Sequence, residues 1–239
     1  MKKILKLVPF IFTCLTVTQV NAAEHVYNIK HTDTVPVIDG NGSDAVWEAA
    51  HALTDFTFPW RADSAPKTEF KALWDAEAVY FRYQVTDSAL AIGSELARGA
   101  LDSDRVEVFL AKDAQLSTYY TMEIDPAAQI YSAEATYDMA LKKRTSLDDS
   151  FSWGSLEYAA SYDQQGYTVE VKLPRAKIAE LGLWQDKDQS QLLCALMRAE
   201  FTPLEAGNID MGWMTWVDPK TAKPNFHNPG TFGQCVLTR

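Results

Sequence analysis

Carboxylates that could act as acid and base stand in pairs along the chain, at Asp102 and Asp104 and again at Glu123 and Asp125. Glycosidases use such pairs to cleave sugar linkages. The chain holds 32 acidic residues, so most pairs of this kind are expected at solvated loop ends. It contains no Gly-x-Ser-x-Gly elbow, Gly-rich phosphate loop or His-Glu-x-x-His motif. The pattern therefore favours a binding protein over an enzyme.

Residue types that bind metals are scattered. The histidines are His25, His31, His51 and His227. Such spacing disfavours a catalytic metal cluster. Residues 39–44 (DGNGSD) resemble the start of a calcium loop, but Ala50 stands at the twelfth position, where that loop needs a bidentate Glu. A turn whose Ser43 or Asp44 caps a short helix is the stronger interpretation.

Aromatic residues are the informative excess, with seven Trp and ten Tyr. The local patterns place Trp47 and Trp74 in the core. Trp216 and Phe226 flank a loop rich in Pro and polar residues, and an aromatic pair in this setting can stack on a sugar ring. Trp216 has two open interpretations, as a buried core residue or as part of a ligand platform. Phe226 is harder to explain as core.

Residues 105–110 alternate strictly, with three aliphatic side chains on one face of a strand and Glu107 with Phe109 on the other. If the aliphatic stripe faces the core, Glu107 points away from it. A charge at the centre of a sheet needs a partner, and Arg198 on another strand is the candidate. Hydrogen bonds from such a pair suit a neutral sugar.

Apolar and polar residues alternate with a period of two in many segments along the chain, and no long segment has helical periodicity. Three hairpins are predicted, at residues 70–74 with 79–85, 119–124 with 129–133, and 156–162 with 167–173. Further strands are predicted at 105–110, 191–201, 211–217 and 232–237, short helices at 45–51 and 175–181, and a polar loop at 140–152. The elements predict an all-β, antiparallel β-sandwich of the jelly-roll or immunoglobulin-like kind, with one or two short helices.

Residues 1–22 read as a signal peptide, with Lys2 and Lys3 before an apolar run and a cleavage site after Ala22. A lipid anchor at Cys14 is disfavoured because Thr13 precedes it. Residues 23–239 then form a single domain, expected as a periplasmic or secreted monomer. A net charge of −10 disfavours nucleic acid and anionic membranes as partners. Export permits a disulfide between Cys194 and Cys235, although two buried thiols are an equal alternative.

Four stretches in order resemble a known family. They are VIDG with DAVW (37–40, 44–47), LWD with VY (73–75, 79–80), DSDRVEVF with YY (102–109, 119–120), and WVDP with FHNP and FG (216–219, 226–229, 232–233). Together they look like the family 9 carbohydrate-binding modules and their stand-alone relatives. The resemblance spans about residue 35 to residue 239.

The resemblance implies a β-sandwich that binds sugars, typically chain ends, in a cleft between two aromatic rings, with structural calcium in some members. Phe226 falls at one ring and Leu101 where the second is expected, so Trp60 or Trp216 would have to supply it. The implied carbohydrate-binding residues are Glu107, Glu123, Arg198, Glu200, Trp216 and Phe226. The family also pairs its last strands, which would make Cys194 and Cys235 neighbours.

Two other functions stay open. The same sandwich superfamily includes b-type haem domains that carry electrons, and this chain offers as ligands Met122, Met197, Met211, Met214 and His227. Methionines on strands are more often core residues. Alternatively, the chain could be an accessory subunit of a glycoside hydrolase.

Overall fold

The computed structural model describes residues 25–93 and 98–239, so the predicted signal peptide lies outside the described residues. Nearly all regular structure there is β-sheet. The strands are β1 (Val26–His31), β2 (Thr68–Trp74), β3 (Ala78–Thr86), β4 (Arg105–Ala111), β5 (Tyr119–Ile124), β6 (Ile130–Asp138), β7 (Lys143–Asp148), β8 (Glu157–Asp163), β9 (Gly166–Pro174), β10 (Gln191–Pro203), β11 (Ile209–Thr215) and β12 (Gly233–Thr238).

Helical structure is confined to short turns. They are the 3₁₀ turns η1 (Ala45–Ala49), η2 (Gly99–Asp102), η3 (Glu205–Gly207) and η4 (Pro229–Thr231), and the α-helix α1 (Arg175–Glu180). The two predicted helices are therefore confirmed as η1 and α1. The Asp44 side chain accepts a hydrogen bond from the Val46 N–H and caps η1, so the DGNGSD segment is the turn and cap that the sequence favoured.

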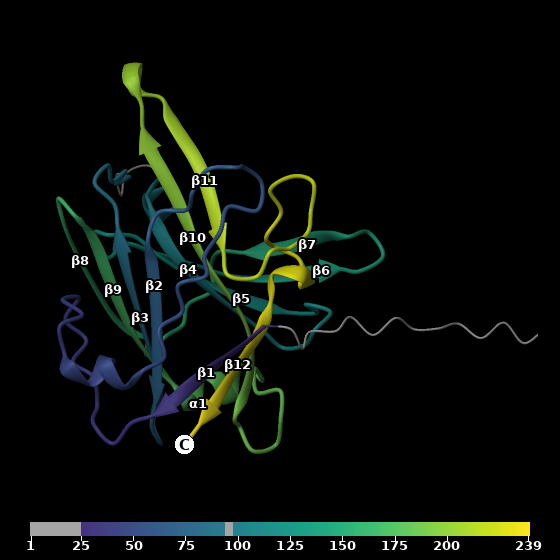
Figure 1. The fold of residues 1–239 in the computed structure, drawn as a ribbon. Coiled ribbons are helices and arrows are strands. Elements are labelled where there is room, and N and C mark those ends of the chain that lie inside the picture. Colours follow the sequence, from purple (N-terminus) through teal and green to yellow (C-terminus); the bar gives the residue numbers. More distant parts are fainter. Residues whose placement is uncertain (1–24, 94–97) are drawn as a thin grey trace, which may run out of the picture.

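The strands form one continuous sheet that folds over on itself. Its order is β7-β6-β5-β4-β10-β12-β1-β2-β3-β9-β8, with β11 paired to β10 beside this path. β1 pairs in parallel with β12 and β2, and the other strand pairs are antiparallel. We call β2, β3, β8 and β9, which lie to the left in Figure 1, the back layer, and β4, β5, β6, β7, β10 and β11, which lie in the centre and to the right, the front layer. The predicted β-sandwich is confirmed.

Apolar side chains of the two layers meet between them. Val106 and Val108 of β4 belong to the same buried cluster as Phe81 of β3 and Val169 of β9. Alternate residues of each strand face this core, because successive side chains of a strand point to opposite sides. The aliphatic stripe read from residues 105–110 therefore faces the core as expected.

One carboxylate holds the opening motif against the back layer. Glu170 of β9 is buried and accepts hydrogen bonds from the backbone N–H groups of Asp39 (3.2 Å) and Gly40 (2.9 Å) and from the Trp47 indole (2.8 Å). Gly40 has a φ of +82°, and a Cβ there would lie 2.7 Å from the Ala160 backbone, so glycine is required. This part of the motif is structural, and Trp47 is a core residue as predicted.

The predicted polar loop at 140–152 is wrong, because it contains β7, which pairs with β6. All six residues of β7 are exposed, so the strand has no buried face and leaves no alternating pattern in the sequence. β1 is likewise not predicted from sequence. No helix among the described residues is long and apolar enough to cross a membrane.

A disulfide joins Cys194 of β10 to Cys235 of β12. The two strands are hydrogen-bonded neighbours, with Leu192 opposite Cys235 and Cys194 opposite Gly233. The predicted neighbourhood of the two cysteines is confirmed, and of the two open alternatives the structure has the bridge.

Candidate functional site

The register of the front layer decides which polar side chains share a face. Glu107 of β4 lies opposite Glu123 of β5 and Met197 of β10, and Glu123 lies opposite Tyr131 of β6. Residues paired in this way point to the same side of the sheet. Val106, the neighbour of Glu107, points into the core. Glu107 and its row therefore point away from the core, to what we call the outer face.

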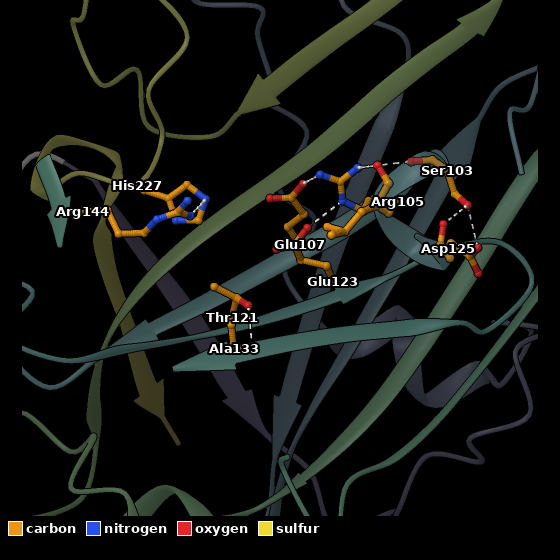
Figure 2. Close-up of polar contacts among 11 residues, drawn as sticks. Ser103, Arg105, Glu107, Thr121, Glu123, Asp125, Ala133, Arg144 and His227 are labelled. Carbon is orange, nitrogen blue, oxygen red and sulfur yellow. Dashed lines mark hydrogen bonds and ion pairs between the residues drawn. The ribbon is translucent and has the colours of Figure 1, made fainter. Parts of the chain in front are cut away.

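Two glutamates and one arginine form a buried triad on the outer face, defined as Arg105, Glu107 and Glu123 (Figure 2). Arg105 Nη2 lies 3.0 Å from Glu107 Oε1, and Arg105 Nε donates to Glu123 Oε2 at 2.7 Å. The three side chains are 7%, 0% and 5% exposed. A single cation therefore balances two carboxylates inside the protein.

Burial controls protonation in the triad. It raises the pKa of Glu107 to about 8, assisted by the negative charge of Glu123 and opposed by Arg105. Burial also raises the pKa of Glu123. Both Glu107 oxygens lack a correctly aligned hydrogen-bond donor, although Arg105 lies within ion-pair distance. The triad therefore retains one proton near neutral pH, which leaves it without net charge.

His227 lies on the same face and is held neutral. Its Nδ1 lies 3.0 Å from the Tyr119 hydroxyl and its Nε2 lies 3.3 Å from Arg144 Nη1 (Figure 2 shows the Arg144 contact). Burial and the positive charges of Arg144 and Arg105 lower the pKa of His227 to about 3. This part of the face therefore gains no charge from the imidazole.

Three half-buried rings form what we call the aromatic platform: Trp60, Trp213 and Phe226. The Phe226 ring centre lies 6.5 Å from that of Trp60 and 6.2 Å from that of Trp213. The Trp60 indole donates to the Thr221 carbonyl at 3.0 Å, which fixes the segment before β2 against the loop after β11. Segments far apart in the sequence thus build one apolar surface.

The platform lies on the outer face. The Phe226 ring centre is 6.3 Å from that of Phe109, which shares its face of β4 with Glu107. Glu107 and Phe226 are therefore on one face of the sandwich, as predicted.

Two predicted site residues lie elsewhere. Trp216 is only 8% exposed and packs in the sandwich core, so its place on the binding surface is a wrong prediction. Arg198 lies opposite Val106 and faces the core, so the predicted pair between Arg198 and Glu107 is also wrong. The reason is the alternation of β10, which puts Met197 rather than its neighbour on the outer face. Arg105, two residues before Glu107 on the same strand, is the actual partner.

Arg198 instead belongs to a core-facing cluster at one end of the sandwich. Its guanidinium lies 3.1 Å from Asp87 at the end of β3, pairs closely with Glu200, and donates to the Thr68 hydroxyl of β2 at 3.1 Å. Glu200 thus also faces away from the outer face. The cluster joins the front layer to the back layer.

Structural calcium does not fit this cluster. Carboxylate oxygens of Asp87, Asp104 and Glu200 lie within 4.8 Å of one another. Arg198 already supplies the positive charge between Asp87 and Glu200, and both Asp104 oxygens accept backbone N–H groups. Burial raises the pKa of Asp104 to about 6 and of Glu200 to about 7, so both carboxyl groups hold a proton more tightly than they would in water.

The carboxylate pairs are also accounted for. Asp102 forms an ion pair with exposed Arg98. Asp125 accepts hydrogen bonds from Ser103 and from the Gln129 backbone, and so fixes a turn. Glu123 is inside the triad. Asp104, Glu123 and Asp125 are buried, so the expectation that such carboxylates lie at solvated loop ends is wrong for these three. They stabilise the local structure from inside the protein.

The proposed haem ligands do not fit an axial pair. Met122, Met197 and Met214 are buried in apolar clusters, and Met211 is exposed near the end of β11. Tyr119 and Arg144 engage both ring nitrogens of His227. A haem iron would have to displace one of them.

Among the outer-face residues missing from the sequence-based site are Arg105, Arg144 and Trp213. Arg105 lies two residues before Glu107, so the two side chains point to the same face of the strand, and this spacing could have identified Arg105. Trp213 and Trp216 are three residues apart, so in an extended strand their side chains point to opposite faces. Only the pairing of β11 with β10 shows which of the two points outward. Arg144 lies on the fully exposed strand that has no sequence signature.

Comparison with known proteins agrees with this architecture. The model of the carbohydrate family 9 binding domain-like family matches residues 38–239. No curated protein sequence matches the chain.

Solved structures share the fold at low sequence identity. A family 9 carbohydrate-binding module from Caldicellulosiruptor kristjanssonii, in complex with cellotriose, is 16% identical, with a TM-score of 0.60 over 90% of this chain and 94% of that chain. A family 9 module from the same organism, in complex with glucose, is 17% identical, with a TM-score of 0.58 over 88% of this chain and 95% of that chain. A Bacteroides uniformis protein is 11% identical, with a TM-score of 0.65 over 89% of this chain and 99% of that chain.

Proposed function

The chain belongs to the carbohydrate family 9 binding domain-like family, and on this premise we propose that it binds a neutral oligosaccharide on the outer face without cleaving it. The family is one of non-catalytic binding modules. We assign the aromatic platform as the surface on which a sugar ring stacks. The proposal extends to capture of polysaccharide chain ends outside the cytoplasm.

The observation that carries the proposal is the platform beside the buried triad on one face. Half-buried aromatic rings offer a flat apolar surface to the C–H groups of a sugar. The triad and neutral His227 leave little unbalanced charge beneath that surface, which favours a neutral ligand over an anionic or cationic one. Direct contact of Glu107 or Glu123 with sugar stays a prediction, because both side chains are buried.

Export is a further part of the proposal. It rests on the signal-like residues 1–22 and is supported by the disulfide between Cys194 and Cys235, since disulfides persist in oxidising compartments. A periplasmic or secreted monomer that holds glycans for a separate hydrolase agrees with these features.

Isothermal titration calorimetry on residues 23–239 tests the proposal. The ligands are glucose and the trisaccharides of β-1,4-linked glucose, xylose and mannose. We expect Trp213→Ala and Phe226→Ala to weaken binding about tenfold, because a ring contact contributes roughly 1–1.5 kcal/mol. Tyr162→Ala is the control, since Tyr162 is exposed on β8 of the back layer. Unchanged affinity in both platform variants would reject the platform, and release of reducing sugar from any of these trisaccharides would reject non-catalytic binding.

A further inference from the structure

A cleft opens where the edge of the front layer approaches β8. Two cavities of about 340 and 670 Å³ share Ile130, Tyr131, Asp149 and Tyr158 as lining residues. Cavities that hold small ligands have comparable volumes, roughly 300–1,000 Å³. We call this pair of cavities the side cleft. None of the three platform rings lines it.

The side cleft carries the chemistry that recognises a neutral sugar. Tyr131 of β6 and Tyr158 of β8 are half-buried tyrosines that line both cavities, and half-buried Phe151 lines the smaller one. Asp149 is exposed and offers a carboxylate to hydroxyl groups. A tyrosine can stack a sugar ring on one face and donate a hydrogen bond from its hydroxyl.

The backbone of β6 adds further hydrogen-bonding groups. β7 pairs with Glu134–Asp138 of β6, while the segment 130–133 pairs with β5 alone among the described strands. A strand edge of this kind presents N–H and C=O groups toward its open side. The part of β6 that lines the cleft therefore offers main-chain donors and acceptors as well as tyrosines.

The cleft begins at the edge of the outer face, at Tyr131, and extends to Tyr158 at the rim of the sandwich core, while the platform lies at the other end of the outer face. Tyr131 begins the row that runs through Glu123, Glu107 and Met197 to β11, and β11 also carries Trp213. From β6 to β11 there are four strand spacings, or about 19 Å at ~4.8 Å each. This length exceeds that of a single sugar ring.

From these observations we infer that the side cleft is a second carbohydrate subsite, which stacks rings of a neutral oligosaccharide on Tyr131 and Tyr158. The inference rests on the proposed function and adds to it a preference for chains longer than the platform alone can hold.

Titration of residues 23–239 with matched tri- and hexasaccharides of β-1,4-linked glucose, xylose and mannose tests the inference. For the sugar that binds, we expect the wild-type protein to prefer the hexasaccharide. Tyr158→Ala should weaken hexasaccharide binding about tenfold and change trisaccharide binding less than twofold. Tyr158→Phe should retain most of the affinity, because the ring remains. Tyr162→Ala, on the same strand, is the matched control.

The outcomes separate the two proposals. Trisaccharide binding that depends on the platform, together with hexasaccharide binding that Tyr158→Ala leaves unchanged, would overturn the side cleft and leave the proposed function standing. Equal wild-type affinity for both lengths would also overturn it. If neither length of any of the three sugars binds, the proposed function fails and the side cleft fails with it. Circular dichroism of each variant checks that the fold is retained.

Discussion

Glu107 is a carboxyl group in a site that disfavours its charge. It is fully buried, its neighbour Glu123 is also acidic, and the nearby Arg105 is shared between the two. An acid whose pKa is higher in the folded than in the unfolded state binds its proton more tightly when folded. Its contribution to stability is then complete below its unfolded pKa and is lost as the pH rises through its folded pKa, here about 8.

Glu107→Gln keeps the shape of the side chain and removes this titration. We expect the variant to gain free energy of unfolding relative to wild type as the pH rises from about 4.5 to 8, by roughly 1–3 kcal/mol at the upper end. Urea unfolding at pH 5 and pH 8 measures the difference. Glu157→Gln, on the exposed edge strand β8, should show no such trend. A constant difference between Glu107→Gln and wild type at both pH values would contradict the raised pKa.

At the scale of elements, β10 connects the two halves of the sheet. It pairs with β4, β11 and β12, and its disulfide to β12 closes a loop with a sequence separation of 41 residues. Cross-linking such a loop restricts the unfolded chain. The segment between the two cysteines includes β11 and the loop that carries Phe226, so the bridge stabilises this part of the outer face.

Replacing Cys194 and Cys235 together by Ala should lower the free energy of unfolding by about 4 kcal/mol, the loop-entropy value for this length. Guanidinium unfolding of the variant and of the oxidised wild type measures it. Wild-type protein reduced with dithiothreitol should approach the stability of the variant. Equal stability of oxidised and reduced wild type would exclude a stabilising bridge.

Glu170 also connects two elements, because it holds the turn before η1 against β9. Glu170→Ala leaves two backbone N–H groups and the Trp47 indole without their acceptor. We expect a loss of about 2–4 kcal/mol in the free energy of unfolding, because unsatisfied buried donors are costly. Glu157→Ala on neighbouring β8 is the exposed control. Sugar affinity should be unchanged, because Glu170 belongs to the back layer; a drop in affinity at equal stability would contradict this.

For the whole molecule, Arg198 joins the two layers at one end of the sandwich. It carries the only guanidinium in the described part of the chain that contacts both Asp87 and Glu200. Removing one partner from a buried ionic group leaves uncompensated charge, which is more damaging than the loss of an exposed pair.

Arg198→Met should therefore lower the free energy of unfolding by about 3–5 kcal/mol at pH 8. The loss should be smaller at pH 5, because Asp104 and Glu200, with pKa values raised to about 6 and 7, then hold protons. Arg98→Met, which breaks an exposed pair with Asp102, should cost less than about 1 kcal/mol. Thermal unfolding at both pH values measures these effects, and equal losses in the two variants would refute the layer-joining role.

The sequence by itself determined the fold class, the hairpins and the two short helices, whereas the neighbourhood of the two cysteines followed from the resemblance to the family. The first three features depend on local alternation, on turn residues and on motifs that lie close together in the chain. Local alternation also placed Glu107 on the side away from the core, and the resemblance to the family placed Phe226 in the same site as Glu107.

Only the tertiary structure decided which side chains meet across strands. Arg105 rather than Arg198 pairs with Glu107, and Trp213 rather than Trp216 joins Phe226, because a shift of one residue reverses the face of a strand. β7 escaped prediction because an exposed edge strand is held by backbone hydrogen bonds, which leave no pattern in its side chains. The partners of a site between distant strands are set by register, and register is a property of the folded sheet.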